Sequence, residues 1–151
     1  MTAYPDTSFL CALYRLQVNS SRAAAYFARL AGPLEVSSLL LFEFRQSVRF
    51  QVRLHRLDKT KGFPAEQGVG MLADLTADLA ASVVVVRPIA WSAVHARAEL
   101  LSEHHTDAHG HRAMDILHVA AALSAGATKF LTFDANQKKL AAAEGLALPM
   151  R

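Results

Sequence analysis

The sequence predicts an α/β fold, a three-layer α/β/α sandwich around a mainly parallel sheet of four to five strands. Short apolar runs alternate with longer amphipathic stretches along the 151 residues, which is the succession expected of βαβ units. Four consecutive valines at residues 83–86, followed by Arg87-Pro88, indicate a buried parallel strand. Residues 1–151 are predicted to form one domain, because no linker-like stretch divides them.

The other strands are expected at residues 2–5, 34–37 and 130–133, with a short edge strand at residues 146–149. Helices are expected at residues 8–17, 21–31, 39–59, 65–81, 91–105, 113–124 and 136–143. In the long helix 39–59, Ser38 is the expected N-cap. The expected inner face of this helix consists of Phe42, Val48, Val52 and Leu57.

The composition indicates a soluble protein with a sizeable core. Hydrophobic residues make up 52% of the chain, which is enough for one compact domain. The N-terminus lacks the charged start and apolar run of a signal peptide, and no apolar run approaches the roughly 20 residues that span a bilayer. The single cysteine, Cys11, excludes an internal disulfide and is compatible with a reducing compartment. We therefore expect a cytoplasmic protein that does not insert into a membrane.

Basic residues are concentrated in one segment. Six of the sixteen Lys and Arg residues fall within positions 45–61, where Asp58 is the only acid. The formal net charge is +3, and it becomes +7 if four of the thirteen acids are set apart in one pocket. A basic surface around an acidic pocket suits a metal-dependent nuclease, because the surface attracts phosphate while the pocket retains cations.

Four acids stand where a parallel α/β sheet forms its binding crevice. Asp6 ends the first predicted strand and Asp134 ends the fourth, while Glu43 lies one turn into the helix after the second strand. Asp115 opens a helix that is otherwise nearly all apolar. Residues just beyond the carboxyl ends of parallel strands converge on one end of the sheet. We therefore expect these four side chains to share one pocket.

Carboxylates that share a half-buried pocket raise one another's pKa and need cations to stay ionised. Hard oxygen ligands favour Mg²⁺ or Mn²⁺, and such an ion can activate a water molecule for attack on phosphorus. Each acid also has a structural interpretation: Asp6 and Asp134 as helix caps, Glu43 as a favourable charge near a helix N-terminus, and Asp115 as a partner of Arg112. The coincidence of all four settings favours the metal site.

The four acidic segments resemble, in order, the motifs of PIN-domain nucleases, and within them those of the VapC-type toxins of toxin–antitoxin pairs. Residues 4–10 (YPDTSFL) look like the family's strand followed by Asp-Thr-Ser, and residues 37–43 (SSLLLFE) are similar to its second acidic motif. Residues 112–123 (RAMDILHVAAAL) match the third motif and residues 129–134 (KFLTFD) match the fourth. Pro5 departs from the pattern, because it lacks an N–H and sheet pairing must end or shift there.

The resemblance implies a PIN-like fold and RNA cleavage that depends on Mg²⁺ or Mn²⁺. It makes Asp6, Glu43, Asp115 and Asp134 the catalytic residues and the metal ligands. It also implies a homodimer and a small partner antitoxin that inserts a segment into the active-site groove.

Further residues are expected to support the site. Thr7 and Ser8 are expected to hydrogen-bond a carboxylate or a water molecule, or simply to cap a helix. Arg112 is expected to contact the scissile phosphate, or to pair with a pocket acid. The basic side chains on one face of the long helix are expected to bind RNA phosphates or an acidic antitoxin, or to be merely solvated; they are Arg45, Arg49 and Arg53.

Three functional interpretations follow. The first is a toxin endoribonuclease, the second is an RNA-processing PIN nuclease without an antitoxin, and the third is a non-catalytic PIN module that binds RNA or protein. The complete set of four acids favours a nuclease over a binding module. The sequence leaves the RNA target, the number of metals and the identity of the antitoxin open.

Overall fold

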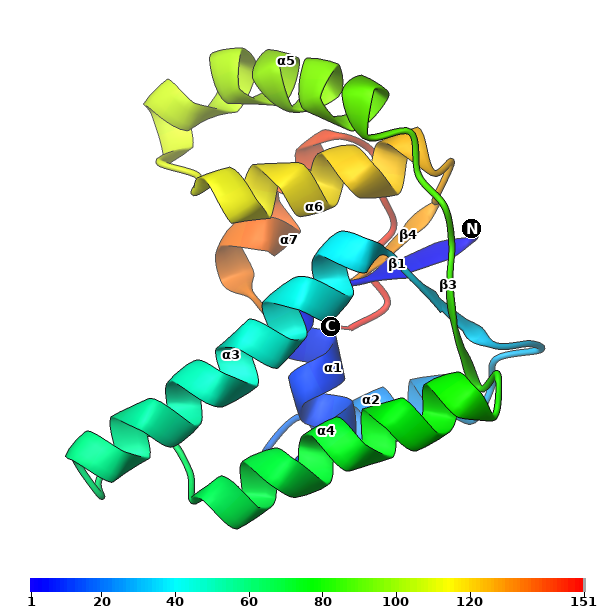
Figure 1. The fold of residues 1–151 in the computed structure, drawn as a ribbon. Coiled ribbons are helices and arrows are strands. Elements are labelled where there is room, and N and C mark those ends of the chain that lie inside the picture. Colours follow the sequence, from blue (N-terminus) through cyan, green and yellow to red (C-terminus); the bar gives the residue numbers. More distant parts are fainter. Residues whose placement is uncertain (151) are drawn as a thin grey trace.

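The computed structural model describes residues 1–150 and has helices on both sides of a short sheet (Figure 1). Its strands are β1 (Ala3–Pro5), β2 (Leu34–Val36), β3 (Val84–Val86) and β4 (Lys129–Leu131). Its helices are α1 (Thr7–Tyr14), α2 (Ser20–Phe27), α3 (Ser38–Leu57), α4 (Ala65–Ala80), α5 (Trp91–His109), α6 (Ala113–Ser124) and α7 (Ala135–Ala143). The predicted three-layer α/β fold is confirmed.

The sheet consists of two parallel pairs, β1 with β4 and β2 with β3. β1 and β2 are neighbours, but within residues 1–150 no ladder of hydrogen bonds joins them. The N–H of Asp6 donates to the carbonyl of Leu131 at 3.0 Å. Because strand residues alternate in direction, the nitrogen of Pro5 faces β2, and it has no hydrogen to donate. The predicted edge strand near the C-terminus is reduced to one parallel bridge between Ala147 and Lys129.

Two hydrophobic cores lie on opposite faces of the sheet. One core joins α1–α4 with β2 and β3, and the other joins α5–α7 with side chains of β1 and β4. Consecutive strand residues alternate between them, so that Phe130 belongs to the second core and Leu131 to the first. Residues that leave the ends of β1 and β4 therefore emerge between the two helical layers.

The long helix α3 begins one residue earlier than predicted, and its inner face differs from the expected one. Ser37 is the N-cap in place of Ser38, and its Oγ accepts from the N–H of Leu40 at 3.1 Å. The predicted inward positions of Phe42 and Leu57 are wrong, since these side chains are 64% and 69% exposed. The buried face follows a spacing of four residues (Leu40, Phe44 and Val48), and position 42 lies on the other side of that helical wheel.

Two other expectations are also corrected. The valine strand is not buried throughout, because β3 pairs only with β2 and lies at the edge of the sheet. Val84 is buried, whereas Val86 is 47% exposed. Helix α5 continues to His109, four residues beyond the predicted end, and stops at Gly110, whose φ of 65° is the left-handed conformation that glycine favours.

Candidate active site

Asp6 is the most enclosed of the four acids. It follows β1, caps α1 and is fully buried. Its Oδ1 accepts from Ser8 Oγ at 2.7 Å and from the N–H of Phe9 at 2.9 Å. Its Oδ2 accepts from the hydroxyl of Thr132, which follows β4. The helix-capping interpretation of Asp6 is therefore confirmed, and Ser8 contacts this carboxylate.

Burial raises the pKa of Asp6 to about 6, against an ordinary value of 3.8. The hydrogen bonds from Thr132, Ser8 and the N–H of Phe9, together with the charge of His118, lower the pKa but do not offset the lost hydration. The ionised form is thus held in a place with little solvent to stabilise it. A cation near Asp6 would relieve this cost.

Glu43 lies on α3 and is held from two sides. Its Oε2 accepts from Nε2 of His118 at 2.7 Å and from the hydroxyl of Thr7. Burial alone would raise the pKa of Glu43, but the hydrogen bond and charge of His118, aided by Thr7, outweigh it and place the pKa below its ordinary value. Glu43 is therefore ionised at neutral pH, with one oxygen fixed by two donors.

A buried chain of polar side chains fixes His118. The imidazole is fully buried, and its Nδ1 lies 3.0 Å from the hydroxyl of Tyr4, which lies 2.7 Å from Ser37 Oγ. With Nε2 of His118 donating to Glu43, the hydroxyls of Tyr4 and Ser37 extend the chain from Nδ1, and each hydroxyl can act as donor or acceptor. Every polar atom of the chain then has a partner. Ser37 also caps α3, so the helix that presents Glu43 and the imidazole that orients it share one anchor.

Asp115 and Asp134 meet at Gln137. Asp115 lies in the first turn of α6, and its Oδ1 accepts from Nε2 of Gln137 at 3.0 Å. Asp134 is exposed and caps α7, where its Oδ1 accepts from the backbone N–H groups of Asn136 at 2.8 Å and Gln137 at 2.9 Å. The capping interpretation of Asp134 is confirmed. Arg112 is exposed, and within residues 1–150 it forms no ion pair with Asp115, which contradicts the structural pairing considered for that acid.

Hydrogen bonds connect three of the four acids. The hydroxyl of Thr132 donates to Asp6 and accepts from the N–H of Asp134 at 2.9 Å. Gln137 then connects Asp134 with the acid of α6. Thr7, the residue after Asp6, donates to the acid of α3. Asp6, Asp115 and Asp134 thus share one hydrogen-bonded network, and Glu43 is linked to it by the chain from Thr7 to Asp6.

Three of the acids keep one carboxylate oxygen free. Among residues 1–150, no hydrogen bond or ion pair reaches Oε1 of Glu43, Oδ2 of Asp115 or Oδ2 of Asp134. Unpaired carboxylate oxygens are the ligands that Mg²⁺ and Mn²⁺ prefer, so the chemistry of the donor set fits such an ion. As placed, no three His, Cys, Asp or Glu side chains in these residues converge closely enough to hold a metal. Metal binding would require the free oxygens to move together.

The basic side chains predicted to form one face of α3 lie on the same helix as Glu43. Arg45 is half-buried, and Arg49 and Arg53 are exposed. α3 runs away from the sheet toward its C-terminal end (Figure 1), so each successive arginine lies about 6 Å farther along the helix from Glu43. Among residues 1–150, these three side chains form no ion pair, which leaves their charges available.

The family model of the PIN domain matches residues 3–143, a span that includes all four acids. The chain belongs to the PIN-domain family. The predicted family is thereby confirmed, and the hydrogen-bonded acids lie inside the matched region.

Several solved structures resemble this PIN domain. VapC20 of Mycobacterium tuberculosis, described as a Sarcin-Ricin loop cleaving toxin, has 20% sequence identity and a TM-score of 0.64, with 97% of each chain covered. FitAcB from Neisseria gonorrhoeae has 17% identity and a TM-score of 0.62, covering 97% of this chain and 96% of that one. VapBC2 from Rickettsia felis, bound to a DNA fragment from its promoter, has 15% identity and a TM-score of 0.63, covering 98% and 97%. Such identities establish a shared fold. Among curated proteins, none matches the chain.

Sequence reasoning missed the residues that connect the acids. Thr132 is the one polar residue in the run Phe130-Leu131-Thr132-Phe133, two positions before Asp134, and that placement was a usable signal. His118 follows Asp115 by three residues and so shares its side of α6. Tyr4 and Gln137 offered no comparable local signal, because their partners lie far away in the sequence.

Replacement of Asp6 by Asn should stabilise the metal-free protein. The raised pKa means that the folded state keeps its proton to higher pH than the unfolded chain, so the free energy of unfolding should fall as the pH rises from about 4 to about 6. Above this range the ionised carboxylate costs up to about 3 kcal/mol, from a shift of about two pKa units. Asp6→Asn removes that charge and keeps the acceptor for Phe9.

Urea denaturation in the presence of a chelator provides the measurement. We expect Asp6→Asn to be more stable than the unmodified protein at pH 8, and its stability to vary less between pH 4 and 6. The exposed Asp74→Asn serves as a control that should change neither quantity. A metal-free Asp6→Asn protein that is less stable at pH 8 would contradict the predicted cost of ionisation.

Removal of the His118 imidazole should raise the pKa of Glu43. In His118→Leu, the carboxylate keeps its burial but loses the donor that most lowers its pKa. Tyr4→Phe is the matched control, since it breaks the contact with Nδ1 and leaves the contact with Glu43; it should cost about 1–2 kcal/mol of stability. Carboxyl ¹³C NMR titration measures both variants. An unchanged Glu43 pKa in His118→Leu would show that the imidazole does not control this acid.

Proposed function

We propose that this PIN domain is a metal-dependent endoribonuclease, and that it acts as the toxin of a toxin–antitoxin pair. The observation that supports the proposal is the hydrogen-bonded set of the buried Asp6, Asp115 and Asp134, with Glu43 held by Thr7, the neighbour of Asp6. A binding module without catalysis has no need for a buried carboxylate that is costly to ionise. Membership of the PIN-domain family and the fold shared with the toxin VapC20 agree with this proposal.

Asp6, Glu43, Asp115 and Asp134 would hold Mg²⁺ or Mn²⁺ through their carboxylate oxygens. When bound, the ion lowers the pKa of a coordinated water and neutralises charge on a phosphodiester. Each acid enters with one oxygen held by neighbouring donors, and three of them have the other oxygen free. Orienting these carboxylates around the ion would therefore cost little side-chain conformational entropy.

The remaining polar groups have separate roles in the proposal. Thr7 keeps Glu43 beside Asp6, and Ser8 donates to Asp6 and accepts from the N–H of Phe133 at 2.7 Å. Both are positioning residues. Arg112 is exposed at the start of α6, where its guanidinium can contact a phosphate in the bidentate manner that arginine favours.

The outer side of α3 is the proposed docking surface for an acidic antitoxin. It combines Arg49 and Arg53 with the side chains of Phe42 and Phe50, which are 64% and 51% exposed. Exposed aromatic side chains between cations suit a protein segment with acidic and apolar residues better than an RNA backbone, which offers mainly phosphate. The VapBC complexes of similar fold support an antitoxin partner.

Assembly and location stay predictions. A homodimer is expected from the family resemblance and is testable by sedimentation. Within residues 1–150, none of the helices has both the length and the apolar character needed to cross a membrane. A cytoplasmic location is proposed from the composition of the sequence.

The catalytic proposal is tested by Asp115→Asn, which keeps an acceptor for Gln137 and should leave the fold intact. Mn²⁺ should raise the melting temperature of the unmodified protein and should not raise that of the variant. Cleavage of a single-stranded RNA should require the metal and fall by about two orders of magnitude or more in the variant. Asp74→Asn should behave like the unmodified protein. No thermal shift and no cleavage at millimolar Mn²⁺ would favour a non-catalytic module.

The toxin role is tested in growing cells. Expression of the protein should arrest growth, and co-expression of a small adjacent gene should rescue it. Asp115→Asn should not arrest growth, while Arg49→Glu combined with Arg53→Glu should arrest growth that the adjacent gene no longer rescues. If the charge-reversal variant instead loses RNA cleavage in vitro, these arginines bind the substrate. Growth without arrest, together with metal-dependent cleavage, would favour an RNA-processing nuclease.

A further inference from the structure

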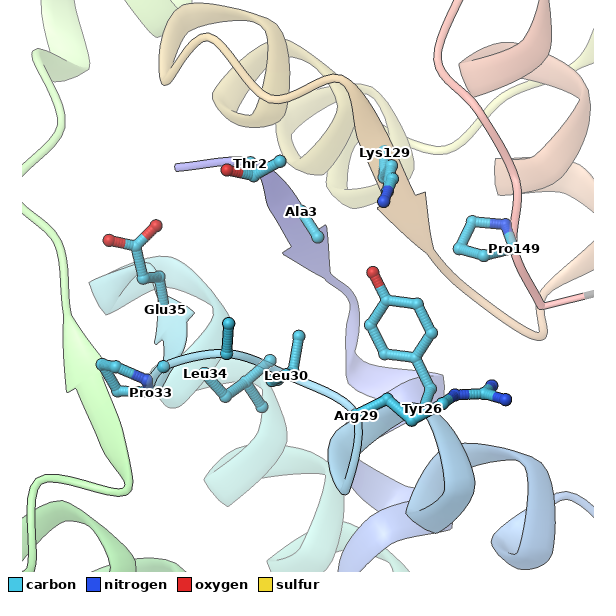
Figure 2. Close-up of a pocket in the computed structure, with 12 residues that line it drawn as sticks. Thr2, Ala3, Tyr26, Arg29, Leu30, Pro33, Leu34, Glu35, Lys129 and Pro149 are labelled. Carbon is cyan, nitrogen blue, oxygen red and sulfur yellow. The ribbon is translucent and has the colours of Figure 1, made fainter.

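A second candidate site lies at the opposite end of the sheet from the acids. A cavity of about 690 Å³ opens there among the first residues of three strands, Ala3 of β1, Leu34 of β2 and Lys129 of β4 (Figure 2). Asp6, Glu43 and Asp134 follow the carboxyl ends of these parallel strands, so the length of the sheet separates them from the cavity. Cavities of this size accommodate ligands as large as nucleotides and cofactors.

The cavity lies where the sheet is divided. β1 and β2 both contribute to its lining, and they are the neighbouring strands that no hydrogen-bond ladder joins within residues 1–150. The residues at this point are small: Ala3, Ala31 and Gly32 all line the cavity. The space therefore results from the missing ladder and from side chains too short to fill the gap.

The cavity has an excess of positive charge. Its one acid, Glu35, is already engaged by Arg87 at 2.9 Å and by the N-terminal ammonium group at 3.5 Å. Lys129 and Arg29 also line it, and neither side chain has an ion-pair or hydrogen-bond partner among residues 1–150. Two uncompensated cations beside one lining surface favour an anionic ligand.

Tyr26 supplies a fixed polar group between these cations. Its ring packs edge-on against the buried Phe9, with centroids 6.2 Å apart. Figure 2 shows its hydroxyl and the ammonium group of Lys129 pointing toward one another across the cavity. Burial raises the pKa of this hydroxyl, and the charge of Arg29 partly opposes the effect. No side chain of residues 1–150 hydrogen-bonds to the hydroxyl, which is therefore free to donate to a ligand.

The other walls are apolar. Leu30, Pro33, Leu34 and Pro149 line the cavity together with the ring of Tyr26. Apolar surfaces of this kind suit a ring system, while the positive charge suits a phosphate, for which lysine provides a point charge. A ligand with both parts fits the two kinds of lining.

We propose that this cavity binds a phosphorylated ligand of mononucleotide size, with its phosphate between Lys129 and the Tyr26 hydroxyl, its ring against the apolar wall, and the exposed Arg29 adding positive charge at the rim. The site is independent of the nuclease activity, since none of its residues belongs to the acidic network. Binding would bridge β1, β2 and β4 at the end of the sheet where backbone pairing is incomplete.

Titration with adenosine 5′-monophosphate tests the proposal, followed by calorimetry and by amide NMR with a chelator present. We expect one saturable site, with shifts confined to the starts of β1, β2 and β4. Adenosine should bind at least tenfold more weakly, because it lacks the phosphate. Lys129→Met should weaken binding of the nucleotide at least tenfold, Tyr26→Phe several-fold, and Arg29→Met by less than Lys129→Met.

Matched controls separate this site from the acidic one. Lys59→Met removes an exposed lysine elsewhere on the surface and should bind normally, as should Asp115→Asn. Thermal melting of the unliganded variants checks their folding, and Tyr26→Phe keeps the test usable if Lys129→Met is unstable. The proposal fails if no saturable binding is seen, if adenosine binds equally well, if Lys59→Met weakens binding as much as Lys129→Met, or if the shifts lie near Asp115.

Discussion

The enclosure of a single carboxylate between two parallel strands is the constraint on which the site depends. The bond from the N–H of Asp6 to the carbonyl of Leu131 fixes the ends of β1 and β4 side by side. Once Asp6 is sealed from water, its oxygens need donors, and Thr132 and Ser8 provide them from the two chain segments that leave these strands. Asp134 is then placed by its own bond to Thr132. A local requirement for hydrogen bonds thus organises a site that extends over several elements.

Helix capping and metal ligation use different atoms of the same side chains. The Oδ1 atoms of Asp6 and Asp134 accept the N–H groups of their helices. At Asp134 the second oxygen has no partner among residues 1–150. The structural and functional interpretations of these residues are therefore compatible, and a cap that fixes one oxygen also aims the other. Capping alone does not explain why Asp6 is buried without a charged partner.

The fold class was predictable, as were the helix-capping contacts of Asp6 and Asp134, because both follow from local patterns. Acids at the ends of apolar runs mark the crevice of a parallel sheet whatever the rest of the chain does.

The edge position of β3 was not predictable from four valines, since the pattern of a strand does not indicate how many neighbouring strands it has. The partners of His118 lie 75 and 114 residues away, so no spacing rule could find them. The prediction of the inner face of α3 was wrong for a related reason. Phe42 is as apolar as Phe44, and only packing against the rest of the fold distinguishes the exposed side chain from the buried one.

The missing ladder between β1 and β2 divides the acids unequally. Asp6 and Asp134 follow strands of one hydrogen-bonded pair, and Asp115 belongs to the helical layer packed on that pair. Glu43 follows β2, on the other side of this missing ladder. Among residues 1–150, its side chain is held only by hydrogen bonds from Thr7 and His118. A small sliding of one half-sheet against the other would therefore change the separation of Glu43 from its three counterparts without breaking a single backbone hydrogen bond. In mechanical terms, the missing ladder makes the gap between Glu43 and the other acids easier to change than distances within either strand pair.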